Sequence, residues 1–101
     1  MRDAVVDLDP TLAEGLTDEH RTAAEVHVLR ARADELRGPQ SGSRALVLAM
    51  RASELEQELL GEVGLDRGAE LLRTMLDHPV TVAAIERWRY AQELARRLIF
   101  D

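Results

Sequence analysis

Apolar residues recur every three or four positions along most of this chain of 101 residues, and no segment alternates between apolar and polar side chains. Glycine and proline residues interrupt the pattern and divide it into four stretches. We therefore expect helices over residues 18–37, from 43 to 61 or 64, over 66–76, and from 79 to the last residue. Four helices with short connections predict an all-α fold, a small four-helix antiparallel bundle.

The expected helix ends depend on residues with known capping preferences. Thr17 is the expected N-cap of the first helix, while Ser43 and Asp66 are the expected caps of the second and third. Pro79 suits the first position of the fourth helix, because its fixed φ angle is helical and its missing N–H is not needed there. Gly64 is the expected left-handed residue that ends the second helix.

Three of the expected helices have an apolar stripe that we predict to face the core. In the first helix it contains Thr22, Val26, Leu29, Ala33 and Leu36, in the second Ala45, Leu48, Ala52, Leu55 and Leu59, and in the fourth Thr81, Ile85, Trp88, Gln92, Ala95 and Ile99. Gln92 is the polar residue in this last stripe, where it either takes part in a buried contact or lies at the wet edge of the bundle.

The run of six apolar residues from 45 to 50 makes the first half of the second helix apolar on every side. Such a helix can pack one face against its own core, and its second apolar face is then expected to bind another surface. The predicted partner-binding residues are therefore Leu46, Val47 and Met50, together with Trp88 and Gln92 on the fourth helix. Trp88 is expected to be either a core anchor, the favoured role, or an interface residue.

The acidic residues are concentrated at the start of the chain. Residues 1–19 contain one arginine and six acidic residues, so most of the net charge of −6 lies there. We divide the chain into a partly ordered acidic N-terminal arm, residues 1–16, and a single helical domain, residues 17–101. The arm either stays solvated or docks on an arginine-rich partner through Val5, Val6, Leu8 and Leu12.

Composition also bears on location and on the class of partner. No apolar run reaches the ~20 residues of a membrane span, and the first residues do not resemble a signal peptide, so we expect a cytoplasmic protein with no membrane contact. All 13 basic residues are arginine, which is typical of a GC-rich bacterial genome. The acidic arm would repel phosphate groups, so nucleic acid is an unlikely partner.

Candidate catalytic and metal-binding residues are few. His20 and His27 lie seven residues apart on one helix, about 10.5 Å along its axis, which excludes one metal ion within a single chain but leaves open a site shared by two subunits. No Glu-x-x-His pattern of di-iron bundles is present, and Glu54, Glu58 and Glu62 are best explained as a solvated face. We predict no catalytic residue, no cofactor and no metal.

Residues 56–76 can also be aligned with a helix-turn-helix DNA-binding motif, because Gly64, Leu65 and Asp66 resemble its turn. In that alignment the recognition helix would bury Glu70 and Arg73. Two buried charges disfavour the motif, so a DNA-binding regulator remains an alternative rather than the prediction.

Two short segments resemble known families. Leu76–Ile85 resembles the segment that leads into the last helix of acyl and peptidyl carrier proteins, which implies a serine carrying phosphopantetheine. The chain has no Asp-Ser-Leu, and Ser53 is the serine at about the right distance. Leu29–Leu36 resembles the first-helix signature of helical chorismate mutases, which implies an arginine-lined site containing Arg30.

Taken together, the residues predict a small helical interaction, assembly or regulatory subunit without catalysis of its own. We expect it to form a homodimer or homo-oligomer, or to bind another protein. The alternatives are a chorismate-mutase-like enzyme, a carrier-protein-like domain and a helix-turn-helix regulator.

Overall fold

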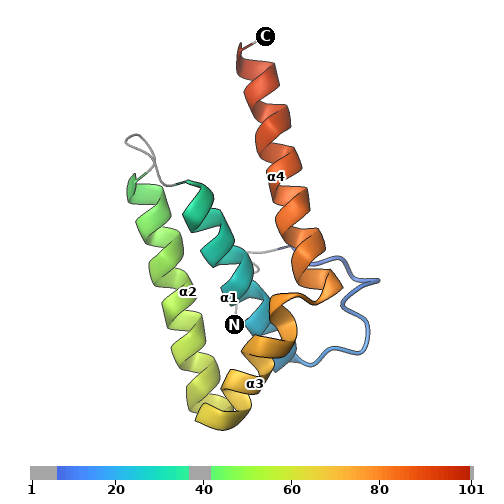
Figure 1. Ribbon diagram of the computed structural model, residues 1–101, viewed down its shortest axis with the longest axis vertical. Coiled ribbons are helices and arrows are strands. Elements are labelled where there is room, and N and C mark those ends of the chain that lie inside the picture. Colours follow the sequence, from blue (N-terminus) through green and yellow to red (C-terminus); the bar gives the residue numbers. More distant parts are fainter. Residues whose placement is uncertain (1–6, 37–41, 101) are drawn as a thin grey trace.

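The computed structural model describes residues 7–36 and 42–100, with the side chain of residue 100 excepted. Four helices account for most of this part: α1 (Asp18–Glu35), α2 (Gly42–Val63), α3 (Leu65–Leu76) and α4 (Pro79–Phe100) (Figure 1). No strand occurs among the described residues, so the predicted all-α class with four helices is confirmed.

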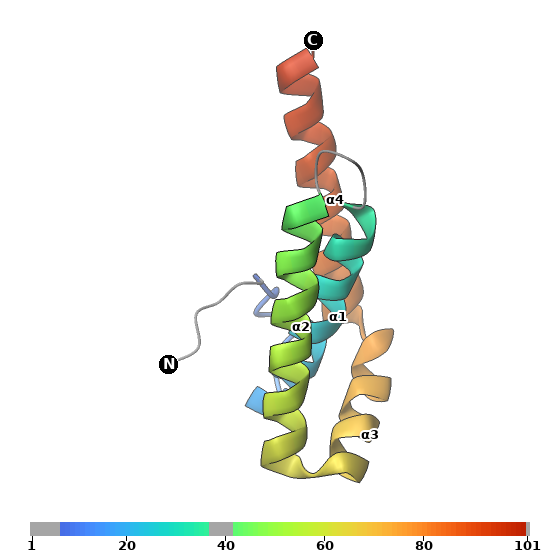
Figure 2. The ribbon, with the colours of Figure 1, turned by 90° about the vertical axis from the view of Figure 1, so that its left-hand side faces the viewer.

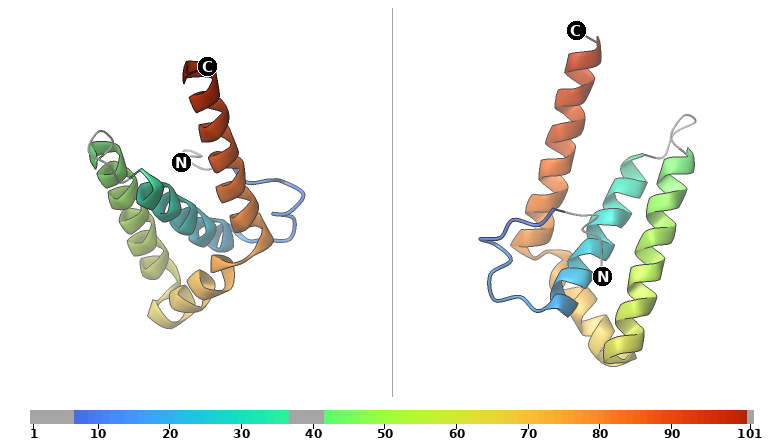
Figure 3. Two further views of the ribbon diagram at one scale, coloured as in Figure 1. Left: turned by 45° about the horizontal axis from the view of Figure 1, so that its top comes forward. Right: turned by 180° about the vertical axis from the view of Figure 1, so that it is seen from behind.

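The helices do not all alternate in direction. α1 and α2 form an antiparallel pair, and α3 turns back from the end of α2 (Figure 1). α4 then continues in the same general direction as α1, leaning away from it and rising past the end of the α1–α2 pair (Figures 2 and 3). The structure is therefore longest along α4, with extents of 47 × 30 × 25 Å.

α1 is the central helix, because it packs against α2, α3 and α4. Its buried residues lie on more than one face and include three alanines, which allow neighbouring helices to approach closely: Thr22, Ala23, Ala24, Glu25, Val26, Val28, Leu29 and Ala33. The backbones of α2 and α4 stay more than 8 Å apart over the described residues. α1 thus holds the other helices together.

The core consists of two clusters of apolar side chains on either side of α1. The first joins Val26, Val28 and Leu29 of α1 to Ala52 and Leu55 of α2 and Ala84 of α4. The second joins Ala23 and Ala24 of α1 to Leu59, Leu71, Met75, Val80 and Ala13. Leu8 and Leu72 pack against both clusters and connect them.

Three of the predicted helix ends are confirmed. The Thr17 hydroxyl accepts a hydrogen bond from the backbone N–H of His20, as expected of an N-cap. Gly64 has a φ angle of +89°, which favours glycine, and this one residue separates α2 from α3. Pro79 is the first residue of α4, and the side chain of His78 accepts a hydrogen bond from the backbone N–H of Val80.

The other two predicted caps are wrong. α2 already includes Gly42, so Ser43 is its second residue and not its cap, and the preceding residue lies outside the described part. Gly64 occupies the N-cap position of α3 without a side-chain hydrogen bond, and Asp66 lies in the first turn. There its carboxylate is favourably placed for the helix dipole. Leu65, the first residue of α3, is exposed.

The predicted stripes of α1 and α2 face the core, with Leu36 and Leu48 half-buried at its edge. The stripe of α4 is correct only in its first half, where Thr81 is buried and Ile85 and Trp88 are half-buried. Gln92, Ala95 and Ile99 are exposed. The reason is that α4 rises past the end of α1 (Figure 2), so the described part of α1 does not cover the second half of its apolar face.

Residues 7–16 are packed against the helices rather than standing apart from them. Ala13 is buried in the second cluster, and Leu8 and Leu16 contact it. Arg87 of α4 approaches carboxylate oxygens of Asp7 at 3.8 Å and of Asp9 at 3.6 Å. Leu12 is exposed, and the expected docking residues Val5 and Val6 lie outside the described residues.

None of the four helices, as far as the structure describes them, contains a stretch long and apolar enough to cross a lipid bilayer.

Gly68 provides a test of how closely α3 approaches α2. A Cβ atom at this buried position would overlap the Cδ2 atom of Leu60, whereas a Cβ atom at Gly61 would meet nothing within 4 Å. A Gly→Ala change inside a helix raises the free energy of unfolding by up to about 1 kcal/mol when no contact opposes it. We expect Gly61→Ala to gain this stability in full and Gly68→Ala to gain less, because the Leu60 side chain must rotate away from the added Cβ atom; urea unfolding measures both.

The overlap can be removed by truncating its partner. In a Leu60→Ala background, Gly68→Ala should become as favourable as Gly61→Ala, because the obstructing atom is absent. Equal stabilisation by the two alanines in the wild-type background would contradict close packing of α3 on α2.

Candidate functional site

The apolar run of α2 presents three large side chains to solvent. Leu46 is 61% exposed, Val47 63% and Met50 56%. Ala45 and Ala52 on the opposite side of the same turns are buried against α1. At 100° per residue the three exposed side chains form one contiguous face, which we call the α2 patch.

A hollow lies beside the α2 patch. It has a volume of about 260 Å³ and is lined by Ser43, Arg44, Val47 and Leu48. Val47 belongs both to the hollow and to the α2 patch. The patch is therefore not flat, and an apolar side chain from outside could enter it.

A second exposed apolar face lies on α4 and was not predicted from the sequence. All of residues 89–99 are exposed, including Leu98 at 79% and Ile99 at 74%. Tyr90 and Leu94 add to the same half of the helix. A signal for this face was present in the sequence, because Leu94 and Leu98 widen the apolar side of α4 beyond one core stripe.

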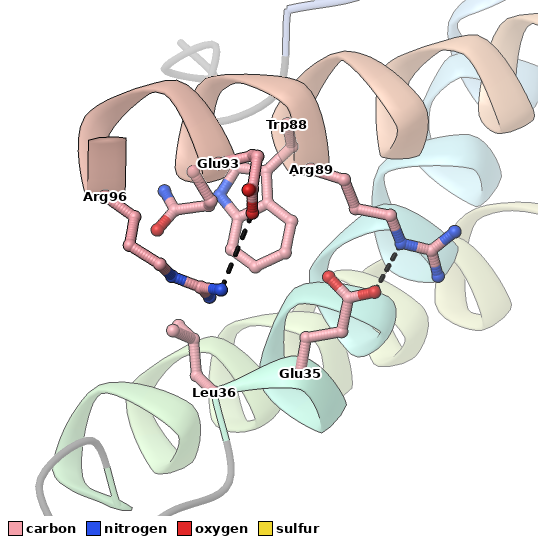
Figure 4. A pocket seen from close by; sticks show the side chains of 7 residues that line it. Glu35, Leu36, Trp88, Arg89, Glu93 and Arg96 are labelled. Atoms are coloured by element: carbon pink, nitrogen blue, oxygen red, sulfur yellow. Dashed lines mark hydrogen bonds and ion pairs between the residues drawn. The ribbon is translucent and has the colours of Figure 1, made fainter. Parts of the chain in front are cut away.

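Between α1 and α4, a pocket of about 290 Å³ opens beside Trp88 (Figure 4). It is lined by Glu35, Leu36, Trp88, Arg89, Gln92, Glu93 and Arg96. The indole ring and Leu36 form its apolar part, while Arg89 pairs with Glu35 and Arg96 lies 3.5 Å from a Glu93 oxygen. Two of the predicted partner-binding residues, Trp88 and Gln92, thus share this pocket, and the α2 patch lies elsewhere.

Arg32 supports the pocket from α1. Its guanidinium carbon lies 5.7 Å from the centre of the Trp88 ring, within the range of a cation–π contact. Burial lowers the pKa of Arg32 from its ordinary value, because a charged group loses hydration there. Its Nε atom is buried without a hydrogen-bond partner among the described residues. The stacking orients the ring of Trp88 at the edge of the core.

The two histidines of α1 have separate local roles. The Nδ1 atom of His20 lies 2.7 Å from the Thr17 hydroxyl, within the N-terminal cap. The Nε2 atom of His27 donates a hydrogen bond of 2.6 Å to the carbonyl oxygen of Leu72. Their seven-residue spacing places both histidines on the helix face opposite the core stripe, which favours surface positions and leaves open a helix contact for His27; at His27 this face is covered by α3. Among the described residues, no group of three or more potential ligands could hold a metal ion.

The residues behind the alternative functions are placed as follows. Arg30 forms an ion pair of 2.6 Å with Glu56, which joins α1 to α2, and Ser53 is exposed within α2. Glu70 and Arg73 are exposed on α3, so these positions are not buried as the helix-turn-helix alignment requires. The carboxylates of Glu54, Glu58 and Glu62 belong to exposed residues of α2.

Arg32 allows a test of what holds Trp88 in place. Replacing it with Met keeps an unbranched stem over the ring and removes a poorly hydrated charge, whereas replacing it with Ala removes both. We expect Arg32→Met to stay within about 1 kcal/mol of the wild-type stability, and Arg32→Ala to lose roughly 1–2 kcal/mol more. Chemical unfolding followed by the fluorescence of Trp88, the chain's one tryptophan, measures both.

Equal losses in the Met and Ala variants would contradict this account, because they would assign the stabilisation to the charge rather than to the stem.

No protein-family model, curated protein or solved structure matches this chain. The function must therefore be argued from the surfaces and side chains described above. Of these, the two exposed apolar faces are the features that the fold itself does not explain.

Proposed function

We propose that this chain is a small helical interaction subunit with an assembly or regulatory role, which binds protein and carries out no chemistry of its own. The observation that carries the proposal is the α2 patch. Its three large apolar side chains are each more than half exposed and face away from the core. Removing apolar surface from water is favourable by roughly 25 cal/mol per Å², so a bound protein surface would be stabilised there.

Several candidate active groups already have structural roles, and this supports binding over catalysis. Arg30 is paired with Glu56, and His27 donates to a backbone carbonyl in the contact between α1 and α3. An enzyme needs such groups to face a substrate pocket with a proton acceptor or a charge available. The pocket beside Trp88 instead contains arginines that are paired with neighbouring carboxylates.

We also propose a class of partner and a cellular location. The partner is a protein, either a second copy of the chain or a different polypeptide. The exclusive use of arginine among basic residues supports a bacterial source, and a chain without cysteine suits the reducing cytoplasm.

The α2 patch can be tested by photocrosslinking in the cells that make the protein. A photoreactive amino acid at Val47 should crosslink to a protein, because this side chain is 63% exposed and belongs both to the α2 patch and to the hollow beside it. The same amino acid at Glu58, an exposed polar residue further along α2, is the matched control and should give no such product. Mass spectrometry identifies the crosslinked protein.

A second variant links the crosslink to the apolar patch. Leu46→Glu should abolish the Val47 product while leaving the melting temperature unchanged, because Leu46 is 61% exposed and outside the core. Val47 and Glu58 giving the same products, or no product at Val47, would contradict the proposed binding surface.

A further inference from the structure

The exposed half of α4 has the dimensions of one side of a helix pair. With 100° between successive residues, Ala91 and Ala95 lie at the centre of its apolar face. Leu94 and Leu98 lie along one edge and Ile99 along the other, on the same side as Trp88. The two alanines at the centre allow a second helix to approach closely, and the larger residues enclose the contact.

We propose that residues 88–99 of α4 pair in antiparallel orientation with the same residues of a second copy of the chain. This inference rests on the proposed interaction function and specifies its partner. A second copy is favoured because the face is self-complementary. In one register, large side chains on each edge of the face lie opposite large side chains on the same edge of the other copy.

Charge favours the antiparallel orientation over the parallel one. A parallel pair would align the two helix dipoles, which is unfavourable. An antiparallel pair opposes the dipoles. When it is centred between Glu93 and Leu94, Arg97 faces the partner's Tyr90 on the same edge. Tyr90 is 69% exposed, and an arginine over a tyrosine ring is a favourable cation–π pair.

The same register fills the pocket beside Trp88. Residue 99 of one copy then lies opposite residue 88 of the other, so Ile99 meets the partner's Trp88. The pocket of about 290 Å³ next to this ring, with Leu36 on its other side, offers space for such a side chain. α4 leans away from α1 at this end (Figure 3), and residues 89–99 are exposed. Twofold symmetry produces both contacts twice.

The pairing involves about twelve residues of each copy, fewer than the 20–30 per partner of a standard interface. We therefore expect a reversible dimer that dissociates on dilution. Sedimentation equilibrium of the wild-type chain over a wide concentration range measures its dissociation constant. Leu98→Glu should raise this constant at least ~10-fold, because a carboxylate would be buried without a partner. Leu65→Glu, the same change at a residue of α3 that is 72% exposed and lies outside both apolar faces, is the matched control and should alter it less than about 2-fold.

Disulfide crosslinking tests the register, since the chain contains no cysteine. In the proposed pair the two copies of residue 94 are offset by ~1.5 Å along the axis and those of residue 98 by ~13.5 Å. Leu94→Cys should therefore form a disulfide dimer rapidly, and Leu98→Cys no faster than Glu54→Cys, an exposed collision control on α2. A parallel pair would crosslink at both positions of α4.

Two outcomes of these experiments would overturn the pairing. Equal crosslinking at residues 94 and 98 excludes the antiparallel register, and a monomer at all concentrations excludes the dimer. In that monomeric case, a Val47 photocrosslink to a different protein would still support the interaction function. Its absence would overturn both proposals.

Discussion

The packing of three helices around α1 is the contact on which the rest of this structure depends. α1 has buried residues on several faces, and α2 and α4 lie on different sides of it, with their described backbones held apart by its width. Alanines 23, 24 and 33 make this possible, because small side chains allow neighbouring helices to approach closely. The hydrogen bond from His27 to Leu72 and the ion pair of Arg30 with Glu56 add specific contacts to α3 and α2.

The fold could be predicted from local signals where one residue type has one physical use. Thr17, Gly64 and Pro79 were placed correctly because a hydroxyl cap, a positive φ angle and a fixed φ angle each suit a particular helix position. Ser43 and Asp66 were misplaced because the helices begin before them, and both residue types are also accepted in a first turn. Periodicity identified the apolar side of each helix, but it carries no information on how far a neighbouring helix extends. For this reason Ala95 and Ile99 were expected in the core, whereas the exposure of Gln92 agrees with the alternative that it lies at the edge of the bundle.

The two apolar faces differ in how visible they are in the sequence. Six consecutive apolar residues cannot all point one way, so the exposure of the α2 patch follows from helix geometry alone. In the exposed half of α4 the sequence signal is weaker: Leu94 and Leu98 widen the apolar side, but the exposure of this half follows from where α1 ends, beside Trp88. His27 illustrates the opposite case: a face that looked free is covered, because α1 has neighbours on several sides.

The exposed end of α4 also has a consequence for local stability. About three turns of this helix consist of exposed residues, supported among the described residues mainly by the pair of Arg89 with Glu35, and isolated helical segments of that length are marginal in water. These turns will open far more often than the part of α4 that contains Val80, Thr81 and Ala84, and their amide protons will exchange sooner. A partner that covers these turns must therefore offset the free-energy cost of ordering them. Helix formation at this end and binding are thermodynamically linked for this reason.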